Sequence, residues 1–237
     1  MSNIHRLSRG AVILVFIQCF SCISGKDYGP LETEKRNISD FSEIEISHGI
    51  DVYLSMDSKE SLVVEVPENL KNHLITEVKG DKLKIYFDKF LNWHKETRVY
   101  VKAKKIDRIS ASGGSDLTGE HTLEGKDLEL KASGGSDIKL DVHTEHLEVN
   151  ISGGADVALS GKTEFLYANT SGGSDLKAFD LVAERAELEA SGGSDIKVFV
   201  EEEIKAKASG GADIEYMGTP HIVDTNTSSS ADIRNRN

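Results

Sequence analysis

The stretch Ser112-Gly-Gly-Ser-Asp-Leu117 decides the fold, because it returns five more times at a nearly constant spacing and once more as a worn copy without the glycines. The later copies begin at Ser133, Ser152, Ser171, Ser191, Ser209 and Ser228, and their aspartates lie 18 to 21 residues apart. A period of this length is the signature of stacked structural repeats. The sequence therefore predicts an all-β solenoid over residues 109–237, with about 19 residues in each coil.

Apolar and polar side chains alternate on both sides of each Gly-Gly pair. Between Leu128 and Val142 the even positions hold Leu, Leu, Ala, Gly, Ser, Ile, Leu and Val, whereas the odd positions are mostly charged. Alternation with a period of two is typical of a strand with one buried face. The parity survives the Gly-Gly pair, which indicates a corner between two strands, and a polar turn at His143-Thr-Glu145 completes the coil. A sandwich of antiparallel hairpins is the alternative, since Gly-Gly also forms hairpin turns.

Residues 41–108 alternate in the same way without repeating the motif. Strands are expected at 44–56, 62–66, 82–87 and 98–103, with a loop or short helix from Pro67. Residues 47–52 align with residues 133–138, so that Asp51 takes the place of the repeat aspartate. This region is predicted to form irregular β coils that open the solenoid. Residues 23–40 are polar and aperiodic, and they are expected to form a flexible tether.

The runs Phe41-Ser-Glu-Ile-Glu-Ile, His48-Gly-Ile-Asp-Val and Gly80-Asp-Lys-Leu-Lys-Ile, followed by the Ser-Gly-Gly-Ser-Asp coils, resemble a known family. It is the "putative auto-transporter adhesin, head GIN domain" family, and the resemblance covers roughly residues 40–217. It implies a right-handed parallel β-helix in an exported protein of a Bacteroidetes-type bacterium. The Gly-Ile-Asn of the family stands here as Gly49-Ile50-Asp51. The family supplies no catalytic residues to carry over.

The repeat aspartates are the main candidate site. Stacked coils would align Asp51, Asp116, Asp137, Asp156, Asp175, Asp195, Asp213 and Asp232 in one outward row, beside a row of serines. Two carboxylates about 4.8 Å apart in water repel by roughly 0.9 kcal/mol before screening. Hydrogen bonds from the turns and nearby cations such as Lys177 would offset this repulsion. Ca²⁺ bridging adjacent coils is the other explanation, so the metal, if any, stays unknown at this point.

The N-terminus predicts export. Arg6 and Arg9 precede an apolar run from Ala11 to Phe20, which is too short for a membrane span and typical of a signal peptide over residues 1–22. Two outcomes are open: lipidation at Cys22, or cleavage near Ser24. We expect a periplasmic or outer-membrane location, with membrane contact only through such a lipid anchor.

Composition and the remaining motifs indicate binding rather than catalysis. With 40 Asp and Glu against 28 Lys and Arg, a nucleic-acid partner is not expected. Phe90 and Trp93 are a candidate aromatic contact for a sugar or a protein, or else a cap on the core. The leading interpretation is a non-catalytic, adhesin-like scaffold without a cofactor, which binds a polysaccharide or protein of the envelope or a host surface. A β-helix enzyme of the polysaccharide lyase type and a Ca²⁺-binding surface protein are the alternatives.

Overall fold

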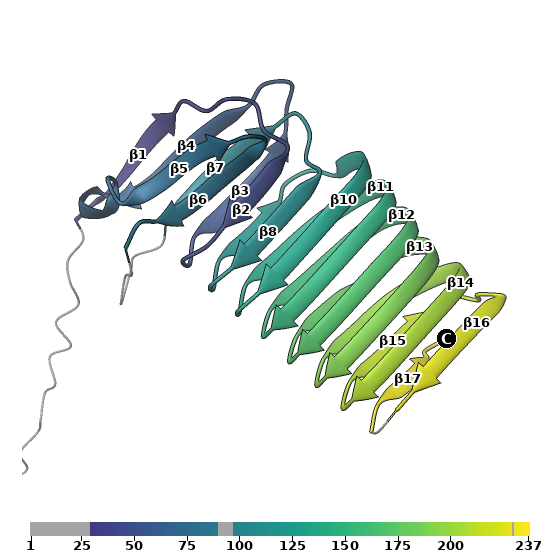
Figure 1. The fold of residues 1–237 in the computed structure, drawn as a ribbon. Helices are drawn as coiled ribbons and strands as arrows, with labels where there is room; N and C mark the ends of the chain where they lie inside the picture. The colour runs from purple at the N-terminus through teal and green to yellow at the C-terminus, as the bar shows by residue number, and fades with distance from the viewer. Residues whose placement is uncertain (1–28, 90–96, 229) are drawn as a thin grey trace, which may run out of the picture.

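The computed structural model describes residues 29–89, 97–228 and 230–237, and it forms one elongated β-solenoid (Figure 1). Seventeen strands and one short 3₁₀ helix are described. They are β1 (Leu31–Arg36), β2 (Glu43–Ile46), β3 (Asp51–Met56), β4 (Ser61–Pro67), η1 (Glu68–Leu70), β5 (Leu74–Lys79), β6 (Lys82–Phe87), β7 (Arg98–Ala103), β8 (Arg108–Ser112), β9 (Asp116–Gly119), β10 (Leu123–Ser133), β11 (Asp137–Gly153), β12 (Asp156–Gly172), β13 (Asp175–Gly192), β14 (Asp195–Gly210), β15 (Asp213–Met217), β16 (Ile222–Thr227) and β17 (Asp232–Asn235). None of the described helices is long and apolar enough to cross a membrane.

The parallel solenoid is confirmed, and the hairpin sandwich is wrong. Strands β8 to β17 pair only in parallel, each with the equivalent segment of the next coil. The predicted inward parity is also confirmed, since Leu128, Leu130 and Ala132 before one corner and Ile138 and Leu140 after it are all buried. Neighbouring coils therefore bury each other's apolar faces in a single core.

The second bend of the coils built by β11 to β14 differs from the prediction of a polar turn. Strand β11 continues through His143, Thr144 and Glu145, and its pairing with β12 stays in register there. Thr144 points inward and is buried, and its hydroxyl donates a hydrogen bond of 3.0 Å to the hydroxyl of Thr163. The stacked threonines satisfy each other inside the bend. The chain consequently changes direction without giving up its β pairing.

The Gly-Gly corners are close backbone contacts between coils. At Gly192 φ is +82°, and a Cβ atom there would lie 2.9 Å from the carbonyl oxygen of Gly172 in the preceding coil. Gly193 has no positive φ, and a Cβ atom on it would lie 3.7 Å from the same oxygen. The N–H of Gly193 donates to that oxygen at 2.7 Å. The first glycine of the corner is thus required by conformation and space, whereas the second is held mainly through its backbone.

The opening coils combine the solenoid with antiparallel strands. β2 and β3 stack in parallel on β8 and β9, whereas β4 pairs antiparallel with β7 and with β1, and β5 pairs antiparallel with β6. The expected strands of this region are confirmed, and η1 follows Pro67. Strand β5 was not expected. These antiparallel strands lie over the first coil at the N-terminal end (Figure 1).

The flexible tether proposed for residues 23–40 is wrong for residues 31–36, which form β1. Strand β1 hydrogen-bonds along the whole of β4, from Leu31 opposite Pro67 to Arg36 opposite Leu62. The side chain of Arg36 then reaches the backbone oxygens of Leu74 and Lys71. Strand pairing and this guanidinium hold the segment to the body. Its sequence, LETEKR, has no apolar alternation, which explains why the pattern did not reveal it.

Candidate functional site

The eight repeat aspartates form one continuous ladder. Each aspartate is paired in register with the aspartate of the next coil, from Asp51 on β3 to Asp232 on β17. The alignment of Asp51 with Asp116 confirms that His48 and Gly49, both at positive φ, form a first corner of the solenoid. The carboxylates therefore lie in single file along the molecule.

The ladder carries an electrostatic cost that differs from coil to coil. Burial raises the pKa of Asp116 and so, to a smaller extent, does the neighbouring Asp137. Burial also raises the pKa of Asp195, with further contributions from the carboxylates of Asp175 and Asp213. Like charges held close together disfavour the ionised form, which is the direction seen here.

Cations and one backbone contact offset part of this repulsion. Lys177 lies 2.8 Å from Asp156 of the preceding coil and 3.7 Å from Asp175 of its own coil, and the pKa of Lys177 is raised chiefly by its hydrogen bond to Asp156. Arg234 forms an ion pair with Asp232 of its own coil. The backbone N–H of Asp137 donates to the carboxylate of Asp116 at 3.3 Å. This donor belongs to the neighbouring coil, whereas the sequence suggested donors from the aspartate's own turn.

The serine before the aspartate forms hydrogen bonds with the backbone of the corners. Ser136 and Ser194 are fully buried, and their hydroxyls donate to the backbone oxygens of Ala111 at 3.1 Å and Ser191 at 3.1 Å. The hydroxyl of Ser115 accepts from the N–H groups of Gly49 and Ile50 at 3.0 and 3.2 Å. These hydroxyls satisfy backbone groups at the corners. Where alanine takes the position, as at Ala155 and Ala212, the side chain is equally buried.

The donor set of the ladder is a poor match to Ca²⁺, which takes six to eight oxygen ligands. Each coil contributes one carboxylate, flanked by glycine and by serines that face inward. Within residues 29–89, 97–228 and 230–237, no group of three or more His, Cys, Asp or Glu side chains is arranged to hold a metal ion.

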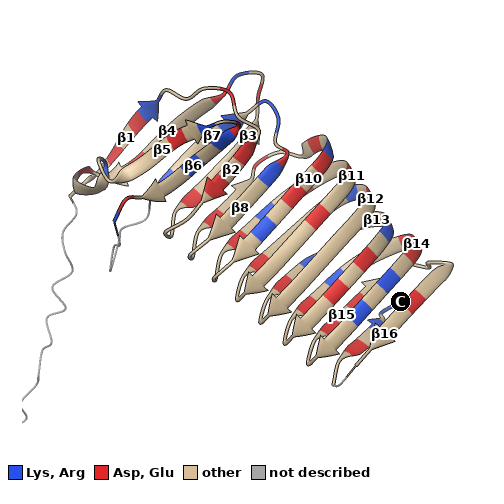
Figure 2. Cartoon of the chain, viewed as in Figure 1, with Lys and Arg blue, Asp and Glu red and all other residues tan. Residues whose placement is uncertain are grey.

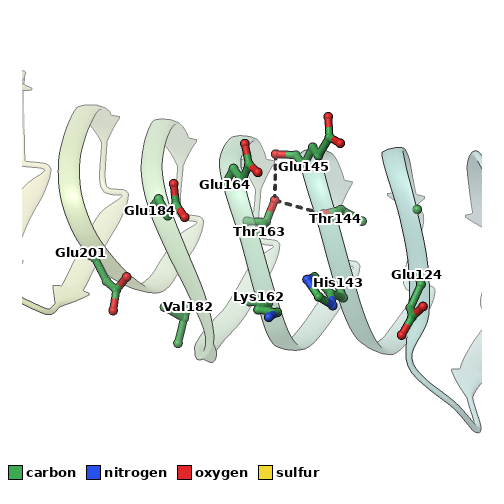
Figure 3. A pocket seen from close by; sticks show the side chains of 11 residues that line it. Glu124, His143, Thr144, Glu145, Lys162, Thr163, Glu164, Val182, Glu184 and Glu201 are labelled. Atoms are coloured by element: carbon green, nitrogen blue, oxygen red, sulfur yellow. Dashed lines mark hydrogen bonds between the residues drawn. The ribbon is translucent and has the colours of Figure 1, made fainter.

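An acidic groove at the other bend of the coils was missed by the sequence analysis. Glu145, Glu164 and Glu184 lie along it on successive coils, above His143 and Lys162, and Glu201 lies lower on the next coil (Figure 3). Its volume is about 540 Å³. The residues are visible in the sequence, but only the register at the continuous bend shows that they share one row.

Three predicted site residues lie outside the described residues: Cys22, Phe90 and Trp93. In the described part of the chain, one pair of aromatic rings stacks, with Tyr53 and Tyr100 5.3 Å apart between centroids. The tyrosines belong to β3 and β7, which pair in parallel and place them opposite each other.

These observations define a parallel β-solenoid whose surface is built from periodic polar rows. The family described as "Putative auto-transporter adhesin, head GIN domain" matches residues 40–220, and the chain belongs to it.

Solved structures share this fold. A putative adhesin from Bacteroides fragilis is 23% identical, with a TM-score of 0.83 over 87% of this chain and 97% of the other. A putative adhesin from Parabacteroides merdae is 20% identical, with a TM-score of 0.73 over 88% and 97% of the two chains. A putative lipid binding protein from Parabacteroides distasonis is 22% identical, with a TM-score of 0.71 over 88% and 98%. No curated protein matches the chain.

Proposed function

We propose that the chain is an exported, non-catalytic binding and scaffold module of the bacterial cell envelope, which attaches to a polysaccharide or protein of the envelope or a host surface. The observation that carries this proposal is the long, rigid face of the solenoid, on which outward side chains stand in fixed rows from coil to coil. Such a surface suits an extended partner. The description of the family and the names of two structural neighbours as adhesins support it.

The arrangement of the polar groups supports binding over the lyase alternative. A lyase needs an irregular cluster of acid, base and cation ligands on one face. Here the aspartates repeat uniformly in single file, and the buried corner serines donate to backbone oxygens. We therefore assign no catalytic residue and no cofactor, and we attribute the Asp ladder to the architecture of the corners rather than to Ca²⁺ binding.

Export and anchoring rest on the N-terminal sequence. Arg6, Arg9 and the following apolar run support a signal peptide, and Ser21 before Cys22 supports lipidation of the thiol. Metabolic labelling with a fatty acid in a lipoprotein-processing bacterium should mark the wild-type chain and leave Cys22→Ala unlabelled. Equal labelling of both chains would refute the anchor, and retention of both in the cytoplasm would refute export.

The binding function itself is tested by presenting the exported chain to an array of glycans, envelope and host-surface proteins, and lipid vesicles, in EDTA and in millimolar Ca²⁺. We expect saturable binding to one class, unchanged by EDTA. The absence of saturable binding on the whole array would contradict the proposal. Binding that requires Ca²⁺ would instead favour the Ca²⁺-binding alternative.

A further inference from the structure

The strands that precede the corners carry three outward rows, which run along the front of the solenoid in Figure 1. The row next to the corner is all serine: Ser133, Ser152, Ser171, Ser191 and Ser209. The second row is Lys131, Asn150, Asn169, Glu189, Lys207 and Asn226, and the third is Glu129, Glu148, Tyr167, Glu187, Lys205 and Asp224. Each row is set by the parallel register and has one member in each coil.

The unequal lengths of these side chains hollow the face. Serines and asparagines form a low floor, and the longer side chains of the third row stand beside it. One hollow of about 380 Å³ extends from Lys131 to Asn169, and a second of about 350 Å³ continues from Asn169 to Asn226. Both hollows are lined by Asn169, so they lie next to each other along the axis and cross the strands; together they are called the groove below.

The centre of this groove is uncharged although the chain as a whole is strongly acidic. Asn150 and Asn169 lie in register with each other there, beside Ser152, Ser171 and Tyr167. In Figure 2, β12 crosses this face as a tan band, whereas β10, β13 and β14 carry charged residues on either side. A groove with this centre offers hydrogen bonds without a counter-charge for an ionic ligand.

Several of these polar groups are available to a ligand. Within the described part of the chain, no hydrogen bond uses the side-chain amide of Asn169 or the hydroxyls of Ser152 and Ser171. Asn150 donates to Glu148 at 2.8 Å, which leaves its amide oxygen as an acceptor. Burial, followed by the nearby carboxylates of Glu189, Glu187 and Glu148, raises the pKa of Tyr167. Its half-buried ring lies beside Asn169 on the same face of β12 and presents an apolar surface there.

We propose that this groove, centred on Asn150 and Asn169 and flanked by Tyr167 of the third row, binds an uncharged polysaccharide that runs along the solenoid axis. Amides and hydroxyls are complementary to sugar hydroxyls, and a tyrosine ring is complementary to the C–H face of a pyranose. The coils repeat at about 4.8 Å, so a polymer laid along the axis meets one serine and one member of the second row at each coil. This inference rests on the proposed binding function and assigns to it a surface and a ligand class.

Isothermal titration of the exported chain with cellohexaose, mannohexaose and chitohexaose tests the proposal, with oligogalacturonate as an anionic probe of the same length. At least one neutral hexasaccharide should bind, and its affinity should exceed that of the corresponding disaccharide because each added sugar reaches another coil. Asn169→Ala and Tyr167→Ala should each weaken binding about fivefold to tenfold, the size of one lost hydrogen bond or ring contact. Asn169→Asp should weaken it further, because it places a charge beside Glu189.

Lys139→Ala is the matched control, since this exposed side chain lies outward on the strand that follows a corner. It should leave the affinity unchanged, and all variants should keep the wild-type melting temperature within a few degrees. Two outcomes would refute the groove as the binding site: neutral sugars still bind Asn169→Asp, or their affinity does not depend on chain length. In both cases the protein would still bind glycans, but at another site. Binding of only oligogalacturonate, a protein or lipid vesicles would overturn the ligand class and leave the proposed function intact. A chain that binds nothing in any class contradicts both.

Discussion

The two glycines of the corner at Gly192 and Gly193 should respond differently to the same substitution. Gly192→Ala puts a side chain at φ +82° and a Cβ atom 2.9 Å from the backbone oxygen of Gly172. The left-handed conformation alone costs an alanine about 1–2 kcal/mol. The contact adds to this cost because the neighbouring atom is backbone and is itself stacked. We expect a loss of about 2–4 kcal/mol, within the range of severe single substitutions.

Gly193→Ala is the built-in control at the same corner. Its Cβ atom would meet the Gly172 oxygen at 3.7 Å, an ordinary van der Waals distance, and its backbone is not left-handed. The substitution also restricts the unfolded chain, which stabilises a compatible site by about 0.4–1 kcal/mol. We therefore expect Gly193→Ala to be neutral or slightly stabilising.

Urea unfolding followed by far-ultraviolet circular dichroism measures both variants, and thermal unfolding provides a second readout. For a domain of this size, 1 kcal/mol shifts the melting temperature by about 2–4 °C, so Gly192→Ala should melt about 4–16 °C below the parent. Hydrogen exchange should localise the loss to the coils on either side of the corner, since repeats are coupled mainly to their neighbours. Equal effects of the two substitutions would refute the assignment of distinct roles to the two glycines.

Three further predictions concern the ladder and the N-terminal end. Asp195→Asn should stabilise the protein at neutral pH by up to about 1 kcal/mol, because it removes repulsion from two neighbours, whereas Asp156→Asn should not, because it loses the contact with Lys177. Since the native pKa of Asp195 is raised, this group stabilises the folded state at pH values below its ordinary pKa of 3.8. That stabilisation is lost as the pH rises through the native pKa. The free energy of unfolding of Asp195→Asn, measured between pH 3 and pH 7, should therefore lack this decrease. Melting curves in EDTA and in millimolar Ca²⁺ should coincide; a shift of several degrees that disappears in an Asp137→Asn, Asp156→Asn double variant would contradict this. Arg36→Ala should increase hydrogen exchange in β1 and β5 while leaving β11 to β14 protected, and uniform protection throughout would show that the guanidinium does not secure this end.

Most of the solenoid could be predicted because its stacking requirement is repeated in every coil. The motif occurs seven times, six of them with the Gly-Gly pair, so local ambiguity in one coil is resolved by the others. Even the divergent corner at Asp51 could be placed, because residues 47–52 align position for position with residues 133–138 of the motif. Its register with Asp116 bears this out.

The parts that could not be predicted depend on a contact made only once. Strand β1 exists because β4 offers a free edge, and nothing in the charged LETEKR segment indicates this pairing. The continuous bend at His143 to Glu145 depends on Thr144 turning inward to meet Thr163, in a segment whose composition is that of a turn. The groove along the solenoid depends on register across coils that are about 19 residues apart in the chain. A sequence pattern shows that the coils repeat, but it does not show which side chains and contacts differ between one coil and the next.

These differences separate the rows that build the solenoid from those that can select a partner. Gly192 is fixed by its contact with Gly172, and the inward side chains are fixed by the core. The Asp ladder offers nearly the same group at every coil, so it cannot distinguish one position along the molecule from another. The row through Asn150, Asn169 and Glu189 is partly exposed to solvent and changes from coil to coil while its backbone register stays constant. Stacking does not determine these side chains, so a preference for one ligand and for one place on the solenoid has to come from rows of this kind. The Ser-Gly-Gly-Ser-Asp motif, although it is the most conspicuous feature of the sequence, mainly builds the fold.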